Sequence, residues 1–215
     1  MIKVISFDIG GTLAKQEKDN YSLKALAILL NKDYDVVRNA YKNVFQKSKG
    51  SFNELLDKFT NILNINKSKE LIEFLNNKFS IKQEEISKEN IELISKLKGM
   101  NYKIILFSNT SNLYNNKLPE DLLKIVDNVF YSYEIGYTKN ENESYKIVEN
   151  KLNNKSNEFL HIGDTLKSDY YAPINNGWNA LYYGYSEDES INEIHSLDEI
   201  FNYLDKNKIK TKYKD

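Results

Sequence analysis

The chain has 215 residues, enough for one large domain or for a domain that carries a smaller insert. Its 30 basic and 31 acidic side chains leave a formal net charge of -1, which gives no overall electrostatic reason to expect nucleic acid or an anionic membrane as a partner. Cysteine is absent, so disulfides, thiolate metal ligands and a cysteine nucleophile are excluded. No apolar run approaches the ~20 residues of a membrane span or resembles a signal peptide, and we expect a soluble, cytoplasmic protein.

The first part of the chain predicts one strand followed by helices. Residues 3–7 form a short apolar, β-branched run typical of a buried strand, and Gly10 and Gly11 end it. Apolar residues then recur at helical spacing, with Ser22 placed to cap the first helix. This spacing predicts helices at 23–30, 36–45, 52–63, 67–79 and 88–98.

From about residue 102 the pattern changes to strands that alternate with helices. The predicted strands are 102–107, 129–131, 159–162 and 179–183, and the predicted helices are 118–126, 143–152, 170–175 and 197–204. We expect the charged terminal stretch 206–215 to fray. Because alternating strands and helices form a parallel sheet covered on both faces, we predict an α/β fold with a Rossmann-like core. In this division residues 1–14 and 86–215 form the core, and residues 15–85 form a helical insert after the first strand.

Polar side chains follow the predicted strands, where ligands bind in open parallel sheets. Asp8, the pair Ser108 and Asn109, and Asp164 stand just after strand ends, and Lys139 lies in the loop after another. Two carboxylates with a backbone carbonyl and waters suit Mg²⁺. A hydroxyl, an amide and an ammonium suit the oxygens of a phosphoryl group. With the anion neutralised, Asp8 could attack phosphorus and form an acyl phosphate.

Four motifs occur in an order and spacing that resemble those of a known family. The chain resembles the haloacid dehalogenase (HAD) superfamily phosphatases that carry a helical, C1-type cap after the first strand. The resemblance covers nearly the whole sequence. The matching segments are FDIGGTL at 7–13, FSNT at 107–110, GYTK at 136–139 with Tyr145 beyond it, and HIGDT at 161–165 with Asp169 beyond it.

This resemblance implies a Mg²⁺-dependent phosphoryl hydrolase that acts on a small phosphorylated metabolite. Asp8 stands in the place of the nucleophile. Asp8, the carbonyl of Gly10 and Asp164 would bind Mg²⁺, and Asp169 would support the waters around the metal. Oligomeric state and pathway have no signal in the sequence.

The resemblance also implies which residues contact the phosphoryl group, and the chain differs from the family pattern at two positions. Ser108 and Lys139 would hold the phosphoryl oxygens. Family phosphatases usually have a second Asp two residues after the nucleophile, where this chain has Gly10. The main-chain metal ligand is retained, but a proton-transfer group worth ~10²–10⁴-fold in rate is lost. Asn140 stands where the family usually has proline after the lysine, which affects loop stiffness more than chemistry.

Three other functions remain alternatives. The DIGGT segment also resembles the phosphate loop of sugar kinases, but a predicted helix follows it here instead of a hairpin. The dehalogenase branch of the superfamily also lacks the second Asp, but it usually has Tyr there and does not need Gly163-Asp164. A regulatory phosphate-binding protein without turnover is the most serious rival.

Three further polar residues have ordinary structural interpretations. His161, on a buried strand, is predicted to be a packed core histidine, and His195 is predicted to be exposed. Arg38 could contact an anionic substrate from the insert, but a solvated helix face is favoured. The paired tyrosines lack the interleaved basic residues of a base-stacking surface.

Overall fold

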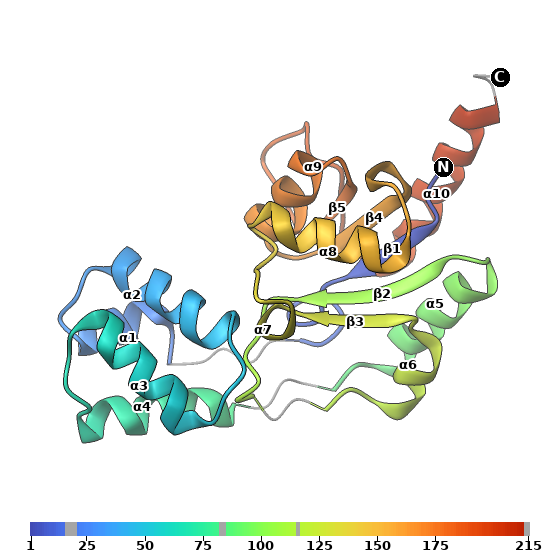
Figure 1. Cartoon of the computed structure of the whole chain (residues 1–215). Helices are drawn as coiled ribbons and strands as arrows, with labels where there is room; N and C mark the ends of the chain where they lie inside the picture. Colours follow the sequence, from blue (N-terminus) through green and yellow to red (C-terminus); the bar gives the residue numbers. More distant parts are fainter. Residues whose placement is uncertain (16–20, 82–84, 115–116, 213–215) are drawn as a thin grey trace.

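The computed structural model describes residues 1–15, 21–81, 85–114 and 117–212, with side chains up to residue 206. Within these ranges six strands form one sheet in the order β3-β2-β1-β4-β5-β6 (Figure 1). Every neighbouring pair is parallel, as the sequence predicts. The strands are β1 (Val4–Phe7), β2 (Lys103–Ser108), β3 (Asn128–Tyr131), β4 (Phe159–Gly163), β5 (Asn179–Tyr183) and β6 (Glu193–Ile194).

The two faces of the sheet are buried in two separate apolar clusters. Side chains alternate along each strand, so Ile5 and Phe7 of β1 enter one cluster and Val4 enters the other. In β2, Leu106 and Phe107 divide in the same way. Burial on both faces explains why the central strands are nearly continuous apolar runs.

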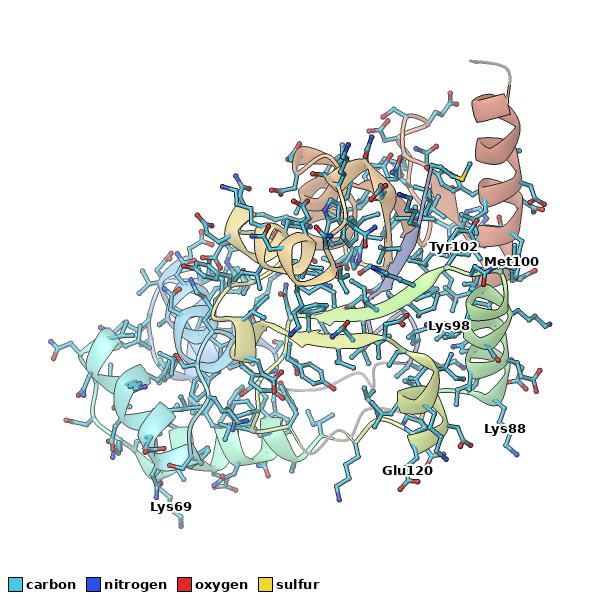
Figure 2. The ribbon with its side chains drawn as sticks, turned by 45° about the vertical axis from the view of Figure 1, so that its right-hand side comes forward. Lys69, Lys88, Lys98, Met100, Tyr102 and Glu120 are labelled. Atoms are coloured by element: carbon cyan, nitrogen blue, oxygen red, sulfur yellow. The ribbon has the colours of Figure 1, made fainter. Side chains whose placement is uncertain are left out.

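Helices from different parts of the chain cover these faces. The first cluster receives side chains from α5 (Lys88–Gly99), α6 (Glu120–Ile125) and α10 (Ile200–Lys212). The second receives them from α8 (Asn142–Leu152), and Ala172 of α9 (Ala172–Asn175) packs against it. Figure 2 shows the turn from α5 into β2, with Lys98, Met100 and Tyr102 labelled along it.

The helices between β1 and α5 have an apolar cluster of their own. Leu26, Phe45, Phe59 and Leu75 are among its buried members, one from each successive part of this segment. In Figure 1 these helices form a group apart from the sheet. They are α1 (Leu23–Leu29), α2 (Tyr34–Tyr41) with a π-helical turn (Lys42–Gln46), α3 (Phe52–Leu63) and α4 (Lys69–Ser80).

Capping side chains explain where these helices begin. Ser22 accepts a hydrogen bond from the N–H of the third residue of α1, and Ser68 does the same for α4. Ser51 and Glu54 form a reciprocal capping box at the start of α3. A separate core and well-capped helices fit the predicted insert. Its division from the core at residues 15 and 85 stays a prediction, and both junctions border residues outside the described ranges.

The structure differs from the sequence prediction in short elements and at the end of the chain. Residues 206–212, expected to fray, continue helix α10 through Lys212, so that expectation was wrong for this segment. The one-turn helix α7 (Ser132–Ile135) and strand β6 were not predicted, because such short segments show no periodicity. A π-helical turn (Leu166–Tyr171) precedes α9. In the part of the chain that is described, no helix is long and apolar enough to cross a membrane.

Candidate active site

The residues that the sequence singled out meet at the carboxyl edge of the sheet. Asp8 follows β1 directly, Ser108 ends β2, and Asp164 follows β4. Right-handed crossovers between parallel strands bring these strand ends to one edge. All predicted site residues line one cavity of about 380 Å³, namely Asp8, Gly10, Ser108, Asn109, Lys139, Asp164 and Asp169.

Lys139 lies at the centre of this group. Its Nζ is 2.6 Å from Oδ1 of Asp8 and 2.5 Å from Oδ1 of Asp169, and its side chain is only 2% exposed. The backbone N–H of Lys139 donates to Oδ1 of Asn109 at 2.9 Å. Asn109 therefore fixes the loop that carries the lysine, in addition to its predicted role as a phosphate ligand.

Three carboxylates, two of them in contact with the ammonium, form a compact oxygen cluster. One oxygen each from Asp8, Asp164 and Asp169 lies within 4.8 Å of the others. When all three carboxylates are ionised, their charge exceeds that of the one ammonium by two, and hard oxygen donors at this spacing fit a divalent cation such as Mg²⁺. The carboxylate oxygens of Asp8 and Asp164 are thus within the roughly 5 Å that two ligands of one Mg²⁺ can span.

The loop after Asp8 approaches Asp164 so closely that only glycine fits. Gly11 has a φ of +83°, and a Cβ placed there would lie 2.1 Å from Oδ2 of Asp164. The bare backbone of Gly11 therefore forms a cradle for this carboxylate. This close packing holds the first and fourth motifs together, although they are about 150 residues apart in sequence.

Burial and neighbouring charges shift the pKa values of the site. Burial opposes the ionisation of Asp169, but the charge of Lys139 and the hydrogen bond from His161 outweigh it and hold the pKa of that carboxyl well below its usual range. Burial, reinforced by the charge of Asp169, raises the pKa of Asp164. Burial also raises the pKa of Asp8, against the attraction of Lys139. Burial opposes the charged form of Lys139, yet the two carboxylates keep its pKa raised, so the lysine is an ammonium.

His161 takes part in this network to an extent that sequence reasoning missed. It is fully buried, as predicted, and burial lowers its pKa, so the ring is neutral. Its Nδ1 is 2.8 Å from Oγ of Ser6, and its Nε2 is 3.3 Å from Oδ1 of Asp169. Donation from Nε2–H to the carboxylate and from the Ser6 hydroxyl to Nδ1 satisfies both contacts. The one available signal was that His161 is the first residue of the fourth motif and that Asp169 follows the same motif.

The helices of the insert form the opposite wall of the cavity. Leu23, Tyr41, Gln46, Lys78 and Ile81 line it from this side. The two sides are also joined by polar contacts at the edge of the cavity.

These edge contacts connect residues 47–50, after α2 and its π-helical turn, to the loops that follow β2 and α7. Lys47 Nζ lies 2.6 Å from Oε1 of Glu141. The side-chain amide of Asn112 donates to the carbonyl of Gly50 at 2.9 Å and accepts from its N–H at 3.2 Å. A ligand in the cavity would therefore contact both the helices between β1 and α5 and the loops at the carboxyl edge of the sheet.

Two residues with open interpretations lie away from the cavity. Arg38 pairs with Asp35 one helical turn away at 3.0 Å, which agrees with a solvated helix face. His195 is exposed, as predicted, and lies 2.9 Å from Oε1 of Glu193. Neither residue lines the cavity.

Comparison with known proteins identifies the family. The haloacid dehalogenase-like hydrolase family matches residues 2–177 of the chain. A sequence comparison with curated proteins gives no match.

Solved structures with the same fold have low sequence identity. The HAD family enzyme BT-2542 from Bacteroides thetaiotaomicron aligns with a TM-score of 0.63 at 19% identity, over 88% of this chain and 97% of that one. The HAD hydrolase YfnB from Bacillus subtilis, bound to magnesium, gives a TM-score of 0.58 at 17% identity, over 95% of this chain and 99% of that one. A HAD phosphatase from Thermococcus onnurineus gives 0.57 at 18% identity, with 94% and 98% coverage. The protein described here is therefore a member of the haloacid dehalogenase-like hydrolases.

Proposed function

We propose that this hydrolase is a Mg²⁺-dependent phosphatase of small phosphorylated metabolites, with Asp8 as its nucleophile. The observation that carries the proposal is the cluster of Asp8, Asp164 and Asp169 within 4.8 Å, with Lys139 held against two of them on the wall of one cavity. A buried nucleophile, an excess of negative charge and a fixed ammonium are the groups that phosphoryl transfer requires.

The residues divide into metal-binding and phosphate-binding groups in this proposal. Asp8, the carbonyl of Gly10 and Asp164 hold Mg²⁺, and Asp169 supports its waters. When bound, Mg²⁺ would supply positive charge that screens the phosphoryl oxygens from the carboxylates. BT-2542 has been crystallised with magnesium and inorganic phosphate, and that complex aligns with this chain at a TM-score of 0.59. This supports the same chemistry for the cavity.

The reaction follows from the positions of the side chains. An oxygen of Asp8 attacks phosphorus and forms an aspartyl phosphate. The ammonium of Lys139, together with Ser108 and Asn109, stabilises the phosphoryl oxygens as charge moves onto them. Residues 15–85 act as a cap that completes the cavity and contacts the rest of the substrate.

Gly10 supports a second candidate function, a phosphate-binding protein without turnover. No side chain at position 10 can protonate the leaving group or activate water, although the metal and phosphate groups remain. Both candidates predict Mg²⁺ and phosphate binding, so only turnover distinguishes them.

Release of phosphate from p-nitrophenyl phosphate tests the proposal, because its leaving group needs no protonation. We expect Mg²⁺-dependent hydrolysis that is abolished in Asp8→Asn. Exposed Asp198→Asn, outside the cavity, is the matched control and should retain activity. Rapid-quench trapping should show a phosphorylated Asp8 that accumulates, because its hydrolysis lacks a base. Binding of Mg²⁺ and phosphate without any turnover would instead establish the second candidate.

A further inference from the structure

The described lining of the cavity holds no unassigned carboxyl group and no imidazole to protonate a leaving alkoxide. Among the described residues that line it, the carboxylates are Asp8, Asp164 and Asp169, and there is no histidine or glutamate. Asp8 is the nucleophile of the proposed function, and the other two are assigned to the metal and to Lys139. A leaving group that can depart as an anion is therefore favoured over one that must be protonated by a carboxyl or an imidazole.

Four tyrosines are among the residues that line the cavity. Tyr131 and Tyr133 stack with ring centroids 5.3 Å apart and planes 10° from parallel. Tyr114 reaches the same cavity, and its hydroxyl lies 3.4 Å from that of Tyr41 on the insert side. We name these four residues the tyrosine wall.

The tyrosine wall acts through its rings more than through its hydroxyls. Burial raises the pKa of Tyr131 to about 12 and raises that of Tyr133. Such phenols are far from the pKa near operating pH that favours proton transfer. The stacked rings instead offer flat apolar surfaces in a cavity that Leu118 and Ile81 also line.

We propose that the substrate is an aryl phosphate, a monoester whose planar ring packs on the tyrosine wall and whose phenolic oxygen leaves without protonation. The inference rests on the proposed phosphatase function and adds the substrate class. A phenol has a pKa of about 10, as in tyrosine. An alkyl alcohol has one near that of water, about 16. The missing acid at Gly10 therefore penalises alkyl esters and spares aryl esters.

The step balances without a protein acid. An oxygen of Asp8 forms a bond to phosphorus while the bond from phosphorus to the ester oxygen breaks, and its electron pair leaves with the aryloxide. A water oxygen then bonds to phosphorus, and the bond to Asp8 breaks with its electron pair returning to the carboxylate. One proton of that water goes to solvent and the other stays on the phosphate product.

The test compares phenyl, benzyl and glycerol 3-phosphate with Mg²⁺ and the full chain. Phenyl and benzyl phosphate carry the same ring, but only phenyl phosphate has a phenolic leaving group. We expect kcat/KM for phenyl phosphate to exceed that for benzyl phosphate by ~10²–10⁴-fold, the contribution of a general acid. Gly10→Asp should narrow this ratio by raising the rate for benzyl phosphate. Equal rates for both esters would overturn the assignment of the leaving group.

Ring recognition is tested separately at Tyr133. Tyr133→Leu should raise KM for phenyl phosphate roughly 2- to 12-fold, as expected for one aromatic contact, without a matching change for glycerol 3-phosphate. Tyr133→Phe keeps the ring and should retain the original KM. Tyr185→Leu, at an 80% exposed tyrosine outside the cavity, is the control. An unchanged KM in Tyr133→Leu, with its melting temperature intact, would overturn the ring contact.

The same assays distinguish a wrong substrate class from a wrong proposed function. Hydrolysis of p-nitrophenyl phosphate with no preference for phenyl over benzyl phosphate would overturn the class and leave the phosphatase standing. No hydrolysis of any of the four esters would overturn both.

Discussion

Replacing Lys139 with methionine removes the ammonium that separates two buried carboxylates. In the native protein its Nζ lies 2.6 Å from Asp8 and 2.5 Å from Asp169. At an effective dielectric constant of ~20, each contact has a gross Coulomb energy of about 6 kcal/mol, most of which offsets the desolvation of the charges. Methionine fills most of the volume but leaves like charges facing each other. Loss of one partner of a buried ion pair costs about 3–5 kcal/mol, and we expect the free energy of unfolding to fall by this amount.

Thermal melting measures this loss. For a chain of this length 1 kcal/mol corresponds to about 2–4 °C, so Lys139→Met should melt about 6–20 °C below the native protein at pH 8. The difference should shrink as the pH falls, because without Lys139 the pKa of Asp8 rises further and protonation removes the repulsion. Lys146→Met, at an exposed lysine on α8, is the control and should melt near the native temperature.

The same substitution should have the opposite effect on Mg²⁺ binding, which it should strengthen. Lys139 and a divalent cation supply positive charge to the same carboxylates, so the variant should bind Mg²⁺ more tightly while it hydrolyses p-nitrophenyl phosphate more slowly. Binding stabilises the folded state by about 2.7 kcal/mol at 100-fold excess over Kd, and the tighter-binding variant gains more at a given concentration. Excess Mg²⁺ should thus narrow the melting difference. Calorimetric titration that shows weaker Mg²⁺ binding, or a melting temperature unchanged by the substitution, would refute the electrostatic reasoning.

Three other substitutions test separate parts of the structure. Gly11→Ala places a Cβ 2.1 Å from Oδ2 of Asp164 at a φ of +83°, which strains the loop by about 1–3 kcal/mol. This strain should weaken Mg²⁺ binding, measured by titration, roughly 5- to 150-fold. Unchanged binding would contradict the role of Gly11 in positioning the Asp164 carboxylate. Asn112→Ala removes two hydrogen bonds to Gly50, each worth about 0.5–1.5 kcal/mol. Loss of this contact at the edge of the cavity should raise KM more than it lowers kcat. A change in kcat alone would contradict a role of the contact in substrate binding. Hydrogen bonds from Lys3 and Asn154 lower the pKa of Glu158 to about 2, so the stability that its charge contributes is full at pH 7 and is lost as the pH falls through about 2. Glu158→Gln should therefore lower the melting temperature at pH 7. An equal effect at pH 2 would exclude the charge of Glu158 as the cause.

The sheet and the location of the site could be predicted because both depend on local sequence signals. Apolar runs at β1, β2 and β4 have the length and composition of strands buried on both faces. A strand that ends in Asp8 or Asp164 also determines where the carboxylate lies, at the carboxyl edge of a parallel sheet. Position along the chain was therefore enough to bring these residues together.

Contacts between distant segments could not be predicted in the same way. The donation from Lys139 N–H to Asn109 and the contact of His161 with Asp169 depend on side-chain rotamers and on loop paths set by packing. The contact of Lys47 with Glu141 joins residues 94 apart, with no local pattern that relates them. Polar networks of this kind leave no periodicity in the sequence.

The hydrogen bonds of Asp169 help to decide what it does in the site. Oδ1 contacts Lys139 and His161, and Oδ2 accepts the backbone N–H of Thr165 at 2.9 Å. A carboxylate offers about four lone-pair sites, so three of them are already used. One remaining site suits a hydrogen bond from a water better than direct coordination in competition with Lys139. In the proposed mechanism we therefore assign direct metal binding to Asp8 and Asp164, and assign to Asp169 the positioning of Lys139, which faces Asp8.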